Sequence, residues 1–359
     1  MEKAYIILEN GRVFEGKRFG ASGSVTAELV FTTGVVGYTE TLTDPSYYGQ
    51  MVMQTFPLIG NYGVITADFE SAEPALSAYI VREYCEKPSN FRCEMTVDEF
   101  LRSRGIPGVW GVDTREITML TREHGVMNAR ITSDPDDTAG IADYRIKDAV
   151  AHVSCREKYT LTPDEGDVRF RVALYDFGEK RNIERELLSR GCAVTVLPYD
   201  TPAEEVLSGG YDGVMLSNGP GDPAENIVPI ENIKKLLGKL PIFGICLGHQ
   251  LTAIAAGGRT VKLKYGHRGA NQPVRSVSVG RTYISTQNHG YAVDASSIPP
   301  EVGFESFVNV NDGTNEGMDY PSLRAFTVQF HPEACAGPKD SEFLFDRFVG
   351  ILGQSDGRK

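Results

Sequence analysis

The start of the chain alternates apolar and polar residues in the manner of a β-hairpin. Residues 4–9 (AYIILE) and 12–17 (RVFEGK) flank Asn10-Gly11, and Asn-Gly is the strongest signal for a two-residue turn between strands. Residues 28–32 (ELVFT) continue the apolar pattern. The chain is therefore predicted to open with a β-rich region.

Helical patterns follow within the same part of the chain. Residues 96–105 combine a capping threonine, an amphipathic turn and a closing glycine. Asp113-Thr114 cap a second helix that ends at Gly125, and a short apolar strand at 109–112 separates the two. This part is predicted to be a mixed α/β domain that is rich in strands.

Residues 33–63 lack any apolar periodicity and are dense in Gly, Thr, Tyr and Pro. That composition predicts a long surface loop with β-turns. A loop of this length inside a compact domain is more often functional or bound to a partner than idle.

From residue 171 the pattern changes to apolar runs of four to six residues that alternate with helical stretches. Such runs indicate parallel strands that are buried on both faces by helices. We expect strands at 172–177, 193–198, 214–217 and 242–245, and helices at 179–190, 202–208, 227–240 and 247–256. The prediction is an α/β chain of two domains, residues 1–169 and 170–359, the second with a mostly parallel central sheet.

The remainder of the second domain reads as strands and a closing helix. After Gly257 the chain is strand-rich, residues 287–291 (QNHGY) are interpreted as a polar turn, and 325–330 is the last strand. A helix over 340–352 carries one apolar stripe, which is typical of packing against a core.

The most informative stretch is Pro241 to Gln250 (PIFGICLGHQ). Gly244 and Gly248 lie two residues on either side of Cys246, which is the spacing of a nucleophile elbow with sulfur in place of oxygen. Glycine tolerates the strained angles and the close strand–helix approach of such a turn, and the helix N-terminus favours thiolate. A buried structural cysteine is the alternative.

A general base is predicted at the end of the last strand. His331 and Glu333 are two residues apart on an extended chain and so share one side, and a carboxylate beside an imidazole fixes its tautomer. Cys246, His331 and Glu333 would then form a thiol triad. His289 is the competing base; the weaker candidates are His124, His152, His249 and His267, of which His249 is expected to pack or hydrogen-bond within its helix.

The loop SNGPGDPA (217–224) contains the spacing G-x-G-x-x-A. A dinucleotide site is rejected because Pro223 and the residues after it do not open a helix at the glycines. The alternative is a loop whose backbone N–H groups, together with that of Leu247, face an oxyanion.

Charge and composition argue against several classes of protein, namely nucleic-acid-binding, secreted and membrane-spanning proteins. The net charge of −12 and the pI of about 5.1 argue against a nucleic-acid-binding face. The start lacks the apolar core of a signal peptide, no apolar run could span a bilayer, and the 6 cysteines show no metal-binding spacing. We expect reduced thiols in the cytoplasm and no metal site.

The motifs GICLGHQ, SNGPGDP, QNHG and QFHPE, in that order, resemble those of the class I glutamine amidotransferases. Further stretches (TGVVGYTETLTDPSYYGQ, PLIGNYG, GVDTREIT, ALYDFGEKRNI and KYGHRGANQPV) resemble the small, glutamine-hydrolysing subunit of carbamoyl phosphate synthetase along nearly the whole chain.

The resemblance implies a role for individual residues. Cys246 attacks the glutamine side chain to form a γ-glutamyl thioester, His331 moves the proton, and Glu333 supports it. The backbone N–H groups of Gly219 and Leu247 hold the oxyanion. Residues that match glutamine-pocket positions are Ser46 from the first domain and Gly219, Gly221, Leu247, Gln250, Asn288, Gly290 and Tyr291. Tyr291 replaces the Phe of some relatives, and Cys335 and Ala336 depart from the usual residues after the triad, without an expected loss of chemistry.

The resemblance also implies a partner. The sequence lacks a G-x-x-x-x-G-K-[ST] loop, so this chain is expected to carry no cofactor, and ATP with Mg or Mn would belong to a separate large subunit. The first domain would dock that subunit in a heterodimer, with higher assembly left open, and the product would serve pyrimidine or arginine synthesis. The alternatives are a silent scaffold subunit, an amidotransferase for another synthetase, or a hydrolase of another amide.

Overall fold

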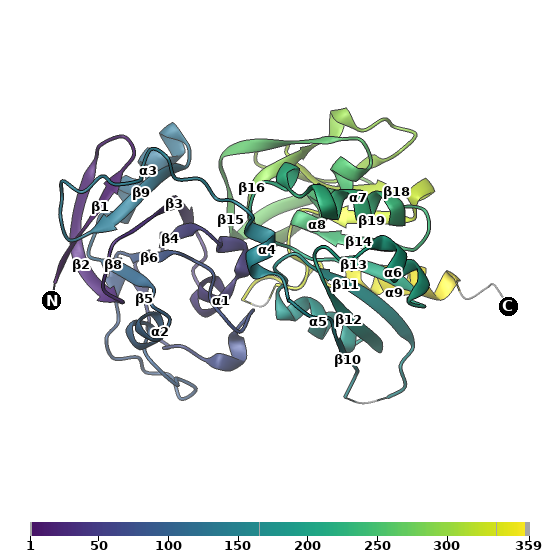
Figure 1. The fold of residues 1–359 in the computed structure, drawn as a ribbon, viewed down its shortest axis with the longest axis horizontal. Coiled ribbons are helices and arrows are strands. Elements are labelled where there is room, and N and C mark those ends of the chain that lie inside the picture. Colours follow the sequence, from purple (N-terminus) through teal and green to yellow (C-terminus); the bar gives the residue numbers. More distant parts are fainter. Residues whose placement is uncertain (1, 165, 335, 356–359) are drawn as a thin grey trace. The chain divides into compact units, whose positions relative to one another are not determined.

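The computed structural model of the chain describes residues 2–164, 166–334 and 336–355 (Figure 1). Contacts between Cα atoms divide the chain into two compact units, Met1–Lys147 (unit 1) and Asp148–Lys359 (unit 2). The division lies 22 residues before the boundary expected near residue 169. Residues 148–169 belong to unit 2, because β10 (Tyr159–Leu161) pairs with β12 (Cys192–Pro198) in the sheet of that unit.

Unit 1 is built around a closed barrel with the strand order β1-β2-β8-β6-β4-β3-β9. The strands are β1 (Lys3–Leu8), β2 (Val13–Gly20), β3 (Val25–Thr32), β4 (Gln50–Gln54), β6 (Ala78–Val81), β8 (Pro107–Trp110) and β9 (Met127–Thr132). The predicted hairpin is confirmed, since β1 pairs antiparallel with β2 and Gly11 adopts a φ of 84° in the turn. Closure of the barrel leaves its strands without an exposed edge.

Two helices of unit 1 begin where the sequence predicted. α2 (Val97–Ser103) has a capping box in which the Thr96 side chain and Glu99 satisfy each other's backbone N–H groups. α3 (Thr114–His124) is capped by the Asp113 carboxylate, which accepts from the N–H of Glu116.

The stretch 33–63 is more ordered than the predicted loop. It contains α1 (Tyr38–Thr43), the 3₁₀ turn η1 (Pro45–Tyr47), and β4, which is buried at every position. It also holds β5 (Leu58–Ile59), which pairs with β7 (Glu83–Tyr84). β4 pairs in parallel with β3 and β6, which are distant in the sequence, so the local pattern of apolar residues does not predict this strand.

Among the described residues of unit 2, one sheet has ten strands in the order β10-β12-β11-β13-β14-β19-β18-β17-β15-β16. The strands β12, β11 (Phe170–Asp176), β13 (Gly213–Leu216), β14 (Ile242–Ile245) and β19 (Ala325–Val328) are parallel and form its centre. Antiparallel strands extend both edges, so the sheet is mixed, with the expected parallel part at its core.

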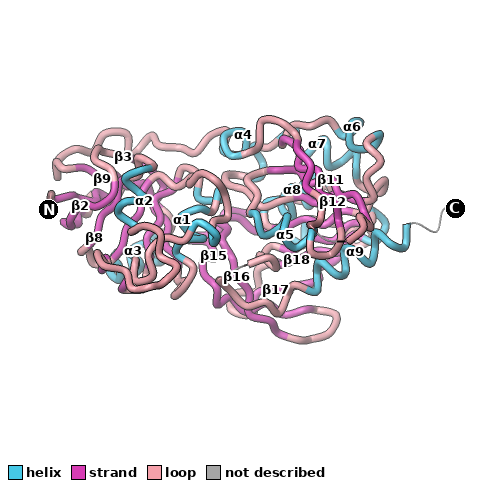
Figure 2. The backbone as a smooth tube through the Cα atoms, turned by 90° about the horizontal axis from the view of Figure 1, so that it is seen from below, coloured by secondary structure: helices cyan, strands magenta, loops and turns pink. Residues whose placement is uncertain are grey.

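Helices cover both faces of this parallel centre, as Figures 1 and 2 show. One face packs on α6 (Ala203–Ser208), α7 (Ile227–Leu236) and α8 (Leu247–Ala255); the other packs on α5 (Arg181–Leu188) and α9 (Phe343–Ser355). Successive residues of β11 alternate between the two cores: Ala173 and Tyr175 face one, Val172 and Leu174 the other. Burial on both faces explains the continuous apolar runs of these strands.

The antiparallel edge of unit 2 consists of β15 (Arg259–Ser276), β16 (Thr282–Asp294), β17 (Phe304–Asn309) and β18 (Asn315–Tyr320). The predicted polar turn at 287–291 is wrong, because these residues lie inside β16 and pair with β15, with His289 opposite His267. Distant pairing, not local apolar pattern, makes this polar run a strand.

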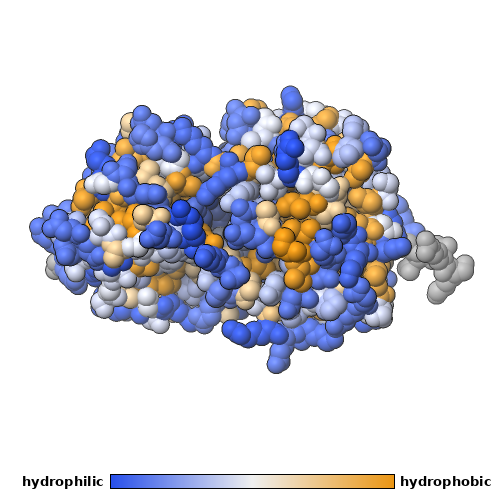
Figure 3. Space-filling view, turned by 45° about the horizontal axis from the view of Figure 1, so that its top comes forward, coloured by the Kyte–Doolittle hydropathy of each residue, from blue (hydrophilic) through white to orange (hydrophobic). Residues whose placement is uncertain are grey.

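Exposed apolar side chains also occur on unit 2, for example Ile227 and Val228 at the start of α7. On the face drawn in Figure 3, hydrophobic residues lie in small groups between hydrophilic ones. Within the described ranges, no helix has the length and apolar character needed to cross a membrane.

Candidate active site

The elbow predicted around Cys246 is present between β14 and α8. Cys246 has φ 52° and ψ −101°, a conformation that costs a non-glycine residue on the order of 1–3 kcal/mol. Its N–H donates to the Val328 carbonyl at 2.9 Å and its carbonyl accepts from the Gln250 N–H at 3.2 Å. The neighbouring strand and the first turn of α8 therefore hold the cysteine in a strained turn.

The two flanking glycines are required by close backbone approach. A Cβ on Gly248 would lie 2.4 Å from the Leu216 carbonyl oxygen, and a Cβ on Gly244 would lie 2.9 Å from Gly248. The contacted atoms belong to the backbone and cannot move aside easily. The G-x-C-x-G spacing thus reflects the packing of α8 against β13 and β14.

The glycine loop after β13 lies against the elbow. A Cβ on Gly219 would meet the Phe177 carbonyl oxygen at 2.1 Å and the Leu247 side chain at 2.8 Å, so Gly219 and Leu247 are neighbours, as an oxyanion site built from both would require. Gly221 has a φ of 90° and lies near Ala149. After the glycines comes a 3₁₀ turn, Pro223–Glu225, and not the N-terminus of a long helix, in keeping with the rejected dinucleotide site.

The predicted histidine–glutamate pair is formed. His331 Nδ1 lies 2.6 Å from Glu333 Oε1, and both side chains are buried. Because a carboxylate accepts, Nδ1 carries the proton and Nε2 keeps its lone pair. Nε2 is buried and has no hydrogen-bond partner among the described residues, so its lone pair is not used by another group there.

The strand order brings the cysteine to this pair. β14 and β19 are parallel neighbours with Ile245 opposite Val328, so the residues that follow them meet at one edge of the sheet. Both also contact β16: the Cys246 thiol donates to the Asn288 carbonyl at 3.7 Å, and the His331 N–H donates to the Thr286 carbonyl at 2.9 Å.

Lys180 is a member of this site that the sequence analysis missed. It is buried, and its Nζ lies 3.4 Å from His331 Nδ1. Burial alone would raise the pKa of Glu333, but His331 and then Lys180 attract its charge and hold that pKa below the ordinary value. The signal was available, since Lys180 follows β11 at the same carboxyl edge of the parallel sheet.

The predicted pocket residues on α8 and β16 are bonded to each other. The Gln250 amide donates to the Tyr291 carbonyl and to Gln329 Oε1, each at 2.9 Å. Asn288 and Gly290 lie beside Tyr291 in β16. The edge strand therefore presents its backbone to the elbow helix.

The competing histidines are engaged elsewhere. His289 has Nδ1 2.8 Å from the Tyr291 carbonyl and Nε2 3.2 Å from Gln287 Oε1. Burial, and then the nearby His267, place its pKa well below the ordinary value. His249 is buried and bonds Thr327 Oγ1 of β19 at 2.8 Å, so it does form a hydrogen bond, but with a strand and not within its own helix as expected.

Three residues that the sequence analysis named remain to be described. Ser46 belongs to unit 1, where it is buried in η1 and its N–H donates to Asp44 Oδ1 at 2.9 Å; its contribution to the glutamine pocket stays a prediction. Cys335 is outside the described residues, and Ala336 has a φ of 69°.

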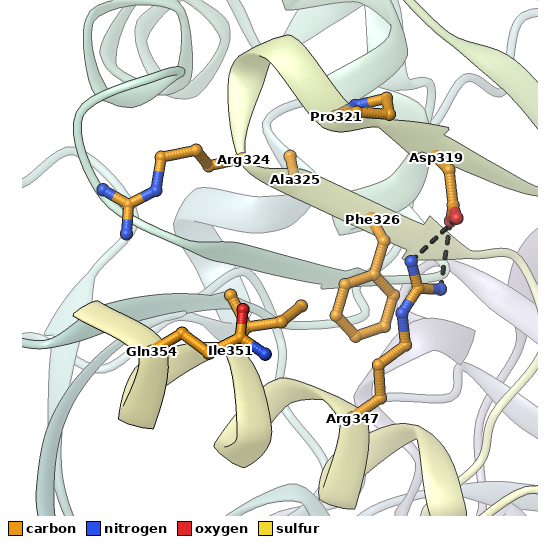
Figure 4. Close-up of a pocket in the computed structure, with 8 residues that line it drawn as sticks. All are labelled: Asp319, Pro321, Arg324, Ala325, Phe326, Arg347, Ile351 and Gln354. Atoms are coloured by element: carbon orange, nitrogen blue, oxygen red, sulfur yellow. Dashed lines mark hydrogen bonds and ion pairs between the residues drawn. The ribbon is translucent and has the colours of Figure 1, made fainter. Parts of the chain in front are cut away.

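A hollow of about 390 Å³ lies near the start of β19 (Figure 4). The ion pair of Arg347 with Asp319, at 2.7 Å, crosses one side of it, and the Arg347 guanidinium lies 4.1 Å from the Phe326 ring centre. Ala325 and Phe326 open β19, whereas His331 follows its other end, so this hollow is separate from the triad.

Comparison with known proteins identifies the class to which unit 2 belongs. Residues 173–351 match the family described as "Glutamine amidotransferase class-I", and that range holds the elbow, the glycine loop and the histidine–glutamate pair. Unit 2 is thus a class I amidotransferase domain.

The first unit identifies the particular family. Residues 6–131 match "Carbamoyl-phosphate synthase small chain, CPSase domain". Curated relatives that bear the name carbamoyl phosphate synthase small chain include one from Clostridium perfringens, 50% identical over 97% of this chain and 99% of its own. Another, from Syntrophotalea carbinolica, is 48% identical over 98% of both chains. The chain belongs to the family of carbamoyl phosphate synthase small chains.

Proposed function

We propose that Cys246, His331 and Glu333 perform the glutamine hydrolysis of this chain, which is the glutamine-hydrolysing subunit of a carbamoyl phosphate synthase. The observation that carries the assignment is the strained elbow cysteine at the edge of β14, next to the buried histidine–glutamate pair that follows β19. A structural cysteine has no need of a backbone conformation that costs free energy.

The reaction follows from the protonation states. His331 Nε2 takes the Cys246 thiol proton, and the sulfur attacks the side-chain amide carbon of glutamine. The C–N bond breaks as His331 returns the proton to the leaving group, which departs as ammonia. Water then adds to the thioester and passes a proton to His331; the C–S bond breaks as His331 hands that proton to the leaving sulfur, and glutamate and the free thiol remain.

Glu333 and Lys180 act on the imidazole. The carboxylate holds Nδ1 protonated and stabilises the imidazolium that forms during each proton transfer. Lys180 adds to the attraction of His331, and together they hold the pKa of the buried Glu333 below its ordinary value. Backbone N–H groups of Gly219 and Leu247 stabilise the tetrahedral oxyanion, a contribution typically worth about 3–4 kcal/mol per donor.

The glutamine itself is held by Ser46, Gly219, Gly221, Leu247, Gln250, Asn288, Gly290 and Tyr291. The mutual bonding of Gln250 and Tyr291 supports a pocket between the start of α8 and strand β16. Rigid elements of this kind position a substrate better than loops.

The ammonia is used by a large subunit, which the family's name as a small chain implies. That subunit would bind ATP with Mg or Mn and use the ammonia to make carbamoyl phosphate from bicarbonate. Unit 1 would contribute to the docking surface of a cytoplasmic heterodimer, and such heterodimers would be the units of any larger assembly.

The test is a glutaminase assay of the purified chain, alone and co-expressed with its large subunit. Cys246→Ser should bind glutamine but lose turnover by a factor on the order of 10³ or more. The matched control is Cys192→Ser, which changes a buried cysteine of β12 and should keep turnover. A Cys246→Ser variant as active as the wild type would refute the assignment.

A further inference from the structure

A buried polar cluster lies behind the β16 residues that we assign to the glutamine pocket. It contains His267 of β15, Gln287 and His289 of β16, and Glu316 of β18, with Asn309 of β17. The available ligand atoms of His267, His289 and Glu316 all lie within 4.8 Å of one another. The proposed mechanism does not use any of these side chains.

Contacts within the cluster surround the Glu316 carboxylate. Its Oε1 accepts from the Asn309 amide at 3.1 Å and lies 3.5 Å from His267 Nδ1. The other nitrogen of His267 lies 2.8 Å from Asp312 Oδ2. His267 therefore bridges two carboxylates, and a buried carboxylate is tolerated only with such compensation.

The cluster reaches the site by a side-chain route. The His267 ring meets the His289 ring edge-on, with centroids 5.0 Å apart and planes at 81°. His289 in turn bonds the Tyr291 carbonyl through Nδ1 at 2.8 Å. The same carbonyl accepts from the Gln250 amide at 2.9 Å, so the orientation of His289 and that of Gln250 are tied at one atom.

A second route runs through the main chain of Glu316. Its carbonyl accepts from the Gln329 N–H at 2.9 Å, and Gln329 Oε1 accepts from the Gln250 amide at 2.9 Å. Glu316 is thus connected to Gln250 both through its side chain and through its backbone.

We propose that Glu316, with His267, is a positioning residue for glutamine binding. The pair fixes the ring of His289 and thereby the backbone of Asn288–Tyr291, against which the substrate is held. This inference rests on the proposed function, because it concerns the same site. In this proposal Glu316 affects the binding of glutamine. Cys246 and His331 keep their positions when the Glu316 side chain is removed.

The experiment uses the full chain co-expressed with its large subunit and measures KM and kcat for glutamine hydrolysis. Glu316→Ala should raise KM about tenfold or more and leave kcat at saturating glutamine within about threefold. Glu316→Gln retains the shape and acceptor oxygen and should keep KM within about threefold of the wild type. His267→Gln, which leaves Glu316 in place, should raise KM in the same direction as Glu316→Ala.

The matched control is Asp319→Ala, which removes a carboxylate from the same strand but breaks only the ion pair with Arg347. It should leave KM unchanged. Equal KM increases in Glu316→Ala and Asp319→Ala would overturn the proposal, because they would indicate general loosening of β18. An unchanged KM in folded Glu316→Ala and in folded His267→Gln would overturn it as well.

Two further measurements separate the competing explanations. The two imidazoles and the carboxylate of the cluster also suit a transition metal, so one equivalent of tightly bound zinc in the purified complex would replace the positioning role with a metal site and overturn the proposal. A wild-type chain without glutaminase activity would refute the proposed function itself, whereas an active wild type with an unaltered Glu316→Ala refutes only this inference.

Discussion

Acid should destabilise unit 2 through His249, a histidine that does not take part in the chemistry. Its ring is fully buried on α8 and bonds Thr327 Oγ1 at 2.8 Å. Burial lowers its pKa from 6.5 to about 3, against a smaller opposing effect of Asn315. The folded protein therefore keeps His249 neutral at a pH where the unfolded chain would protonate it.

The sign and size of the effect follow from this difference. Between pH 6.5 and pH 3 the unfolded state binds more protons, so the free energy of unfolding falls as the pH is lowered. For these two pKa values, the loss from pH 7 to pH 5 is about 2 kcal/mol. The stabilisation is fully present above pH 6.5.

The assay is urea unfolding at pH 5, 6, 7 and 8, followed by far-UV circular dichroism. His249→Gln cannot titrate, so its stability should fall less steeply with acid than that of the wild type, by about 2 kcal/mol over the same interval. The only tryptophan in the sequence, Trp110, lies in unit 1, and its fluorescence gives a reference transition from the same sample.

Two results would refute this reasoning. Wild type and His249→Gln are compared by pH slope and not by absolute stability, and identical slopes would show that His249 does not resist protonation. An equal change of slope in His124→Gln, which alters an exposed histidine of unit 1, would show that the effect is not specific to burial.

Three further predictions concern the site. Gly248→Ala should destabilise the protein by about 1–3 kcal/mol in thermal or urea unfolding and lower turnover, because its Cβ would meet the Leu216 carbonyl at 2.4 Å; unchanged stability would contradict the close approach. Lys180→Met should lower kcat/KM about tenfold and move the acid limb of its pH profile upward, because Glu333 loses a nearby cation; a limb that moves downward would contradict this. His331→Asn should reduce kcat far more than His289→Asn in the same glutaminase assay, and the reverse order would make His289 the base.

The parallel centre of unit 2 could be predicted because its strands are buried on both faces. β13 and β14 each appear in the sequence as an uninterrupted apolar run, and β11 contains one at residues 172–175. The elbow could also be predicted, because the two glycines around Cys246 are required by the close approach of nearby backbone atoms.

Features that depend on distant pairing could not be predicted in this way. The polar run at 287–291 is a strand because β15 lies beside it, and β17 and β18 were not anticipated. The closure of the barrel depends on β9, which pairs with both β1 and β3. The position of Lys180 in the site also depends on a distant contact, because His331 lies 151 residues further along the chain.

The conformation of Cys246 sets stability against activity at a single position. Only glycine occupies a φ of this sign without penalty, so Cys246→Gly would relieve the backbone while it removes the thiol that we propose as the nucleophile. The proposed nucleophile therefore lowers the free energy of unfolding by the cost of its own backbone conformation.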